Sequence, residues 1–292
     1  MTRTPARLDA VVTVARFAFA ESLRRRVFAV VAVLTVVFLA LYGIGSHFAF
    51  QEAEGFATTP ADLADERAIT GSTVFGLAMF ATLFLGAVLA TFLTIGVVRG
   101  DAETGLLQPL VVRPLGRGAM LVARYAGAAV ASGVYVLVVY AIALAITSLT
   151  GDWTPDHIVV PGLVLAGATT IIAAISVLAS VFMTSTAQGI AVFMIFGAGL
   201  VAGLLGQIGN ALNSDNLIEI AEIAIWALPF EALYQHGLYE LSSDQEGITE
   251  TLVQLGPFGG AQQAAAGLVL WSMIYTGAVV GAAVVAFGRR DL

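Results

Sequence analysis

Residues 158–183 read IVVPGLVLAGATTIIAAISVLASVFM, an unbroken apolar stretch without one charged side chain. At a rise of about 1.5 Å per residue, a helix of this length crosses the roughly 30 Å hydrocarbon core of a bilayer. The rest of the chain suits the same solvent, because 59% of its 292 residues are hydrophobic and only 11% are charged. The stretch therefore predicts an integral membrane protein.

Five further apolar runs have a similar length. The strands of a membrane β-barrel would appear as short segments of alternating hydrophobicity, so these unbroken runs predict an all-α fold. We predict a single transmembrane domain, residues 1–292, with six transmembrane helices. The predicted spans are residues 27–48, 74–98, 119–149, 158–183, 190–208 and 264–287.

Charge divides the chain between the two sides of the membrane. With six spans and the N-terminus on side one, that side carries twelve arginines against five carboxylates, a net charge of +7. Side two carries Arg67 against fifteen carboxylates, a net charge of −14. Arginine-rich connections stay in the cytoplasm during insertion, so side one is cytoplasmic. We therefore predict a multi-pass protein of the cell membrane with both termini in the cytoplasm.

The segment before the first span, residues 1–26, is predicted to be a cytoplasmic amphipathic helix. Its polar residues recur near helical spacing beside an apolar face, and such a helix lies in the headgroup plane with its arginines toward anionic lipid. The alternative is that the segment extends the first span and supplies its positive flank. The arginines expected to anchor the helix and the inner ends of the spans to membrane lipid are Arg16, Arg24, Arg25, Arg26, Arg289 and Arg290.

The cytoplasmic connection, residues 99–118, contains the most specific pattern, RGDAETGLLQPLVVRPLGR at residues 99–117. Acidic residues near a helix start, a glycine that allows a turn and two prolines predict a short helix-turn-helix along the membrane surface. Its leucines and charged ends suit docking into a soluble partner, whereas the alternative is an ordinary basic loop that only sets topology. The predicted docking residues are Arg99, Asp101, Glu103, Thr104, Gly105, Leu106, Leu107, Pro109, Arg113, Pro114 and Arg117.

The outer connection, residues 209–263, is long and partly apolar. Side chains between Leu217 and Leu228 follow helical spacing over a stretch that is too short to span a membrane. We predict a re-entrant or interfacial outer helix here. The candidates for a gate at the outer side are Glu219, Glu222, Trp226 and Pro229. The alternative is a helix that rests on the outer leaflet through its aromatic residues.

The polar residues of the spans are mild. They are Thr91, Thr94, Ser132, Thr147, Thr169, Thr170 and Ser176, and no carboxylate lies at mid-depth. Transporters driven by protons or ions usually need an ionisable group there, so the spans suit an amphipathic or lipid-like cargo. His47, His157 and His236 fall on side two without a metallopeptidase spacing. We therefore predict neither a catalytic site nor a metal site.

Paired glycines in the last two spans predict close approach between helices. Small residues four apart let two helix backbones pack against each other. The contact is either within the chain or at the seam between two chains. The pairs are Gly199 with Gly203 and Gly277 with Gly281.

The pattern at residues 99–117 resembles the first cytoplasmic loop of the type-2 permeases of ATP-binding-cassette (ABC) exporters, the ABC-2 family. That family's pattern is close to E-x-G-T-L-x-x-L-L-x-x-P-x-x-R. Here Thr104 precedes Gly105 instead of following it, a mild departure. The ending FGRRDL at residues 287–292 resembles the F-x-R-R-D-L ending of the family, and the basic amphipathic opening is also similar. The likeness covers essentially the whole chain.

The resemblance implies the non-catalytic translocation half of an exporter. Two permease chains, identical or related, would pair, and each would rest its loop around Glu103 in a cleft of a separate nucleotide-binding ATPase, which binds ATP and Mg²⁺. This chain itself has no G-x-x-x-x-G-K-[ST] motif and no lysine. No nucleic-acid partner is expected. The alternatives are a membrane anchor or assembly factor without transport, and an intramembrane enzyme.

Overall fold

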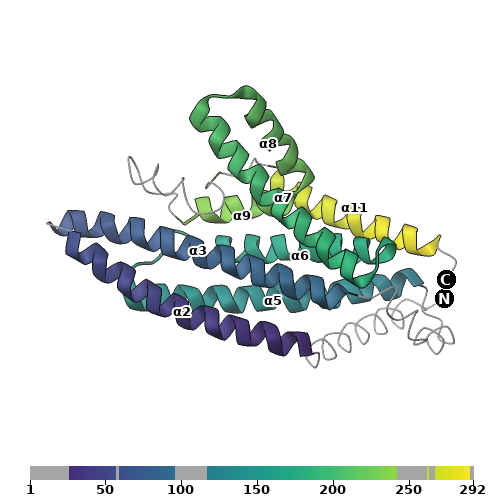
Figure 1. Ribbon diagram of the computed structural model, residues 1–292, viewed down its shortest axis with the longest axis horizontal. Coiled ribbons are helices and arrows are strands. Elements are labelled where there is room, and N and C mark those ends of the chain that lie inside the picture. Colours follow the sequence, from purple (N-terminus) through teal and green to yellow (C-terminus); the bar gives the residue numbers. More distant parts are fainter. Residues whose placement is uncertain (1–25, 57–58, 96–116, 242–261, 263–266, 290–292) are drawn as a thin grey trace, which may run out of the picture.

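The computed structural model describes residues 26–56, 59–95, 117–241, 262 and 267–289 (Figure 1). Within these ranges the regular secondary structure is entirely helical. The helices are α2 (Arg26–Phe56), α3 (Pro60–Thr94), α5 (Arg117–Gly151), α6 (Val159–Phe182), α7 (Ser185–Leu212), α8 (Asp215–Ala227), α9 (Pro229–Tyr239) and α11 (Leu268–Gly288).

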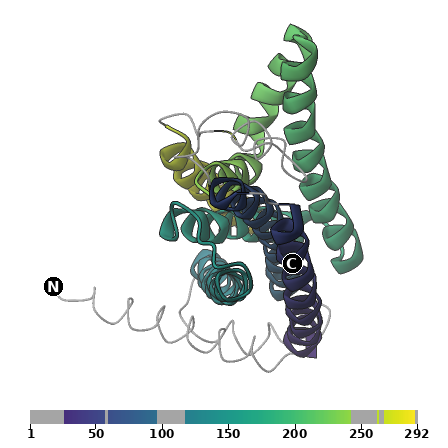
Figure 2. The same cartoon turned by 90° about the vertical axis from the view of Figure 1, so that its left-hand side faces the viewer.

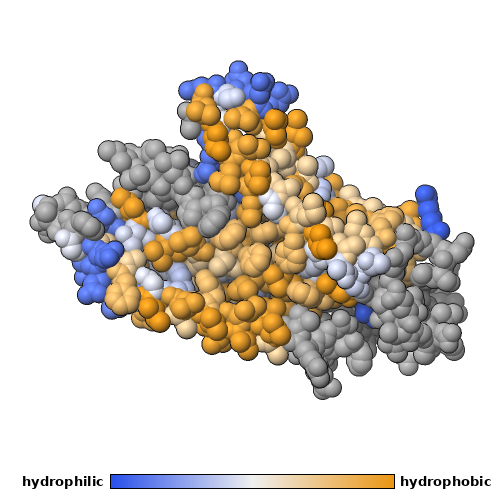
Figure 3. Space-filling view, viewed as in Figure 1, coloured by the Kyte–Doolittle hydropathy of each residue, from blue (hydrophilic) through white to orange (hydrophobic). Residues whose placement is uncertain are grey.

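Six of these helices, α2, α3, α5, α6, α7 and α11, are long and apolar enough to cross a membrane. The mean hydropathy of their apolar windows lies between 2.0 and 2.5. On the face that Figure 3 shows, hydrophobic side chains cover the flank of the bundle, and hydrophilic side chains gather at its ends and at the tip of the α7–α8 hairpin. A helical bundle presents such an apolar belt to lipid. The predicted all-α fold with six membrane helices is confirmed.

Buried clusters show how the helices alternate in direction. The start of α2, the end of α3 and the start of α5 pack together around Leu93. The start of α5 also packs with the ends of α6 and α11 around Leu121. We call this the Thr94 end of the bundle, after the last residue of α3. The connections at this end of the bundle are those that the charge count predicts to be cytoplasmic.

The opposite end, which we call the Trp153 end, is held by aromatic packing and an ion pair. Trp153 packs against Gly71 of α3, and Arg67 donates from Nη2 to Glu54 Oε1 of α2 at 2.7 Å. Most of residues 49–73, which lie between the first two predicted spans, is helical, because α2 continues to Phe56 and α3 starts at Pro60. These helices are longer than a bilayer core requires, so their polar ends extend past the apolar belt.

Burial separates the central helices from the peripheral ones. Much of the apolar surface of α3 and α6 is buried, whereas α2 and α11 leave most of theirs exposed. Hydroxyl pairs between helices hold α2 to α5, since an unpaired hydroxyl in hydrocarbon is costly. The pairs are Thr35 with Tyr135 (2.5 Å), Tyr42 with Thr147 (2.5 Å) and Ser46 with Thr150 (2.7 Å).

The outer connection folds into two helices rather than one. α8 runs back along α7, and the two form a hairpin that stands away from the bundle (Figure 2). A turn at Asn213, whose φ is 49°, reverses the chain between them. After Leu228 the chain turns again, and α9 packs against α6 with nearly all of its side chains buried. α9 is therefore the part of this connection that enters the protein interior.

Candidate functional site

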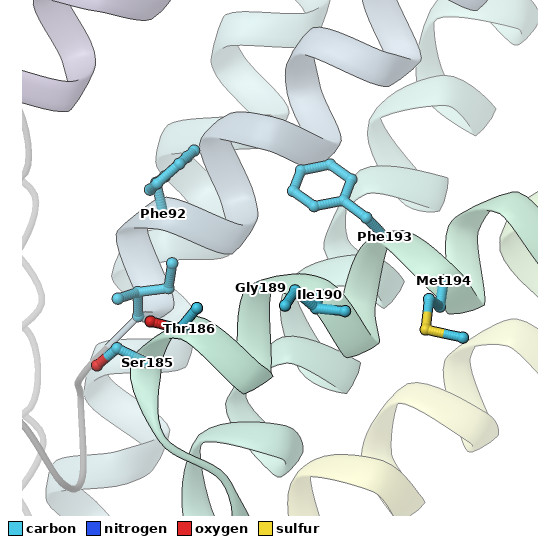
Figure 4. A pocket seen from close by; sticks show the side chains of 8 residues that line it. Phe92, Ser185, Thr186, Gly189, Ile190, Phe193 and Met194 are labelled. Atoms are coloured by element: carbon cyan, nitrogen blue, oxygen red, sulfur yellow. The ribbon is translucent and has the colours of Figure 1, made fainter.

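A groove of about 570 Å³ opens between α3 and α7 near the Thr94 end (Figure 4). Its lining residues are Phe92, Ile95, Ser185, Thr186, Gly189, Ile190, Phe193 and Met194. The lining is mostly apolar, and the first turn of α7 adds the hydroxyls of Ser185 and Thr186. Farther along, the ring of Phe84 on α3 lies 6.2 Å from that of Phe193 and 6.0 Å from that of Phe196, so aromatic contacts join the two helices there.

A buried polar cluster joins α3, α6 and α7 next to this groove. Gln188 Nε2 donates toward the carbonyl oxygens of Thr94 at 3.2 Å and Ser176 at 3.0 Å, and lies 3.0 Å from Ser176 Oγ. The Thr94 hydroxyl donates to the same Ser176 Oγ at 2.7 Å. All three residues are buried. The two hydroxyls could be identified from the sequence, but Gln188 could not, because one glutamine near the start of an apolar run is no recognisable motif.

Most of the predicted docking residues lie outside the described residues. α3 ends at Thr94, and Arg117 is the first residue of α5, so the described chain brackets the predicted loop on both sides. The residues from Arg99 to Pro114 fall between these helices and are not described. Of the predicted lipid anchors, Arg16, Arg24, Arg25 and Arg290 are likewise outside the described ranges. Arg26 opens α2, and Arg289 is exposed directly after α11.

The predicted gate residues divide between α8 and α9. Glu219 and Glu222 are exposed on α8, away from the bundle interior. Trp226 is also exposed, but its carbonyl oxygen accepts a hydrogen bond of 2.9 Å from Nε1 of Trp271 on α11, and the two indole rings lie 5.9 Å apart. Pro229 is buried as the first residue of α9. Three of the four predicted residues are therefore exposed on α8 and one is buried in α9, and their role as a gate stays a prediction.

The strongest buried polar feature is Glu231 on α9, which sequence analysis did not single out. The side chain is buried, Gln235 Nε2 lies 3.4 Å from its Oε1, and its Oε2 has no hydrogen-bond partner among the described residues. Burial raises the pKa of the carboxyl from 4.5 to about 8, only partly offset by the hydrogen bond from Gln235. The carboxyl is therefore mainly neutral at pH 7. Burial, and secondly the negative charge of Glu231, raise the pKa of Tyr234.

The glycine pair of α7 explains how Glu231 comes to be buried. A Cβ at Gly203 would lie 2.5 Å from Gln235 Nε2 and 2.7 Å from Glu231 Oε1, and one at Gly199 would lie 2.6 Å from the Phe230 ring. α9 thus occupies the space that side chains at these glycines would fill, so this pair makes an intrachain contact. The pair on α11, Gly277 with Gly281, faces open space within the described structure.

Two of the predicted outer histidines meet one carboxylate at the end of α9. His157 Nδ1 lies 3.2 Å from Glu240 Oε2, and His236 Nε2 lies 3.8 Å from Glu240 Oε1. The backbone N–H of His157 also donates to the Glu240 carbonyl oxygen at 3.3 Å. These contacts fasten the end of α9 to the start of α6. His47 lies elsewhere, exposed on α2 beside Phe48.

Comparison with known proteins places the chain in one family. Residues 12–292 match the family described as ABC-2 family transporter protein. The matched range includes all six membrane helices. No curated protein matches the chain. The match extends over far more than half of the sequence, and the six apolar helices are long enough to cross a membrane. This chain therefore belongs to the ABC-2 family, the permease subunits of ABC transporters.

Proposed function

We propose that this permease subunit is half of an exporter, driven by ATP that a separate ABC ATPase hydrolyses. The observation that carries the proposal is the family match over residues 12–292 of a chain that folds as six apolar helices. ABC-2 permeases are generally non-catalytic. The polar groups of the spans fit that role, since hydroxyls such as those of Thr91, Ser132 and Thr169 bond to carbonyl oxygens of their own helices.

The ATPase is proposed to dock at the Thr94 end of the bundle. The loop between α3 and α5 carries the family-like pattern from Arg99 to Arg117, and the charge count predicts that this side is cytoplasmic. Charge-assisted hydrogen bonds that Glu103 accepts and the loop arginines donate would hold the loop in the ATPase. Closure of two ATPase subunits would then move the spans and alternate access to a path between two permease chains.

The proposed cargo is an amphipathic or lipid-like molecule. α6, α7 and α11 carry no charged side chain, and the Glu231 carboxyl that packs against α7 is mainly neutral at pH 7, so these helices offer no fixed charge for a bare ion. The groove between α3 and α7 instead presents aromatic and aliphatic surface, with the hydroxyls of Ser185 and Thr186 at one end. An apolar chain fits the aromatic and aliphatic surface, and a polar headgroup fits the end with the two hydroxyls.

Reconstitution with the ATPase tests this function. The partner is sought in the neighbouring reading frames and purified together with this chain into lipid vesicles. The proposal expects a stable complex whose ATP hydrolysis changes when candidate amphipaths are added, and which moves the effective amphipath across the bilayer. Movement of cargo with no ATPase bound would contradict it. A stable complex whose ATP turnover no amphipath alters would favour a membrane anchor instead.

A further inference from the structure

We propose that Gln188 is a positioning residue that joins the end of α3 to α7, so that movement of the loop after α3 is passed to α7. The inference rests on the proposed function, because that function makes the loop the place where an ATPase acts. Beyond that function, α7 is the helix that moves when the loop moves, and Gln188 is the side chain that links α7 to α3. Gln188 is 1% exposed and lies where α3, α6 and α7 meet.

The end of α3 is capped by a side chain of α7. The last carbonyl groups of an α-helix have no partner within the helix, and buried ones need donors from elsewhere. Thr94 is the last residue of α3, and Gln188 Nε2 donates to its carbonyl oxygen at 3.2 Å. A side chain of α7 therefore caps α3 at the residue before the loop begins. Displacement of this end of α3 acts directly on Gln188.

Position 188 needs a side chain that donates hydrogen bonds. Two carbonyl oxygens and the Ser176 hydroxyl oxygen surround Nε2, and a carbonyl oxygen can only accept. The site therefore requires a donor with at least two hydrogens, which fixes the amide with its nitrogen toward α3 and α6. Methionine has a similar length but offers no donor, and glutamate would bring an acceptor against acceptors. Glutamine suits the position through its hydrogens as well as its size.

α7 connects Gln188 to the contact with α9. From Gln188 to Gly203 is a helical distance of about 22 Å at 1.5 Å per residue. At Gly203 the same helix packs against Glu231 and Gln235 of α9, and beyond it α7 continues into the α7–α8 hairpin. An uninterrupted helix between these points moves as one body. A shift of α3 at Thr94 therefore reaches the buried face of α9 through Gln188 and α7.

The contacts between α3 and α7 leave room for such a movement. The Gln188 cluster joins them at one position and the rings of Phe84, Phe193 and Phe196 at another, and the groove lies beside these contacts. Ring contacts can slide, whereas two hydrogen bonds to carbonyl oxygens hold a fixed geometry. The polar contact is therefore the one that makes α7 follow α3.

The test measures movement of α7 in the complete complex with its ATPase. The chain contains no cysteine, so spin labels can be placed on introduced cysteines at exposed Val201 of α7 and exposed Val138 of α5. The distance between them is recorded in lipid nanodiscs before and after adding Mg²⁺ and a non-hydrolysable ATP analogue. In the otherwise native chain, the nucleotide is expected to shift this distance. In Gln188→Met the shift is expected to fall at least about twofold.

Two further variants distinguish coupling of α3 to α7 through Gln188 from a general loss of stability. Thr82→Val removes another buried hydroxyl of α3. Among the described residues this hydroxyl bonds only to the carbonyl oxygen of Ala78 in the same helix, so the variant should keep the full nucleotide-induced change in distance. If Gln188→Met does not assemble, Gln188→Asn keeps an amide but is one methylene shorter, which draws the nitrogen away from the carbonyl oxygens of Thr94 and Ser176 and is expected to reduce the shift. An undiminished shift in Gln188→Met, or in Gln188→Asn where that variant is needed, overturns the coupling through Gln188 while the proposed function stands. No shift in the otherwise native complex also overturns the coupling, and the reconstitution assay decides the proposed function separately.

Discussion

Replacing Glu231 by glutamine should stabilise the protein, and more so at alkaline pH. The native carboxyl is buried against Gly203, and its pKa is raised from 4.5 to about 8. Below about pH 4.5 the carboxyl is neutral in the folded and unfolded chain alike, so its ionisation has no effect on folding. As the pH rises toward 8, the unfolded chain ionises while the folded chain stays protonated, and stability is lost. Above pH 8 the loss is complete and constant.

The size of this loss follows from the two pKa values. At about 1.36 kcal/mol per pKa unit, a rise from 4.5 to about 8 corresponds to roughly 5 kcal/mol, an upper limit because a destabilised site relaxes and admits water. Glutamine is neutral at every pH and can still accept from Gln235. Glu231→Gln should therefore match the native chain near pH 4.5 and exceed its stability by a few kcal/mol at pH 8.5.

The assay is thermal unfolding in lipid nanodiscs at a series of pH values from 4.5 to 9. The matched control is Glu222→Gln, which makes the same substitution at an exposed side chain of α8 and should not reproduce the stabilisation expected of Glu231→Gln. A difference between Glu231→Gln and the native chain that does not grow between pH 5 and pH 8 would refute the reasoning. It would mean that Glu231 ionises freely and that α9 does not bury it.

Three further changes test separate parts of the structure. Gly199→Ala places a methyl group against the buried ring of Phe230 and should lower the free energy of unfolding by about 1–3 kcal/mol, whereas Gly277→Ala, which meets open space, should not; equal melting temperatures for both variants would contradict the packing of α9 on α7. A double-mutant cycle of Tyr42→Phe and Thr147→Val should give a coupling energy of about 0.6 kcal/mol, and strict additivity would show that this hydroxyl pair does not hold α2 to α5. Glu103→Ala should reduce transport and the stimulation of ATP hydrolysis, while membrane insertion, measured by fractionation, stays intact. Unchanged transport in this variant would contradict the docking role of Glu103.

The six membrane helices could be predicted because their signal is local. A run such as residues 158–183 is apolar over the whole thickness of a bilayer, and lipid leaves a helix as the only economical way to satisfy its backbone. The ends were less predictable, since helices continue into water when their polar residues favour it. α2 runs to Phe56 and α7 to Leu212, past the apolar runs that marked them.

The buried polar positions could not be predicted in the same way. Glu231 follows Pro229 in the first turn of a helix, which is where a solvent-exposed carboxylate is also common. It is buried because Gly199 and Gly203, about thirty residues earlier, let α9 approach α7 closely. Gln188 likewise acquires its role from Thr94 and Ser176 on two other helices. Contacts that depend on three elements leave no periodic pattern in any one of them.

The central claim is that the end of the bundle where α3 stops and α5 begins faces the cytoplasm, where an ATPase can reach it. Because the chain contains no cysteine, single cysteines introduced at Thr104 and at exposed Asp152 can be probed with a membrane-impermeant maleimide in intact cells. The account predicts labelling at position 152 from outside, and labelling at position 104 only after the membrane is opened. Labelling at position 104 in intact cells would contradict it.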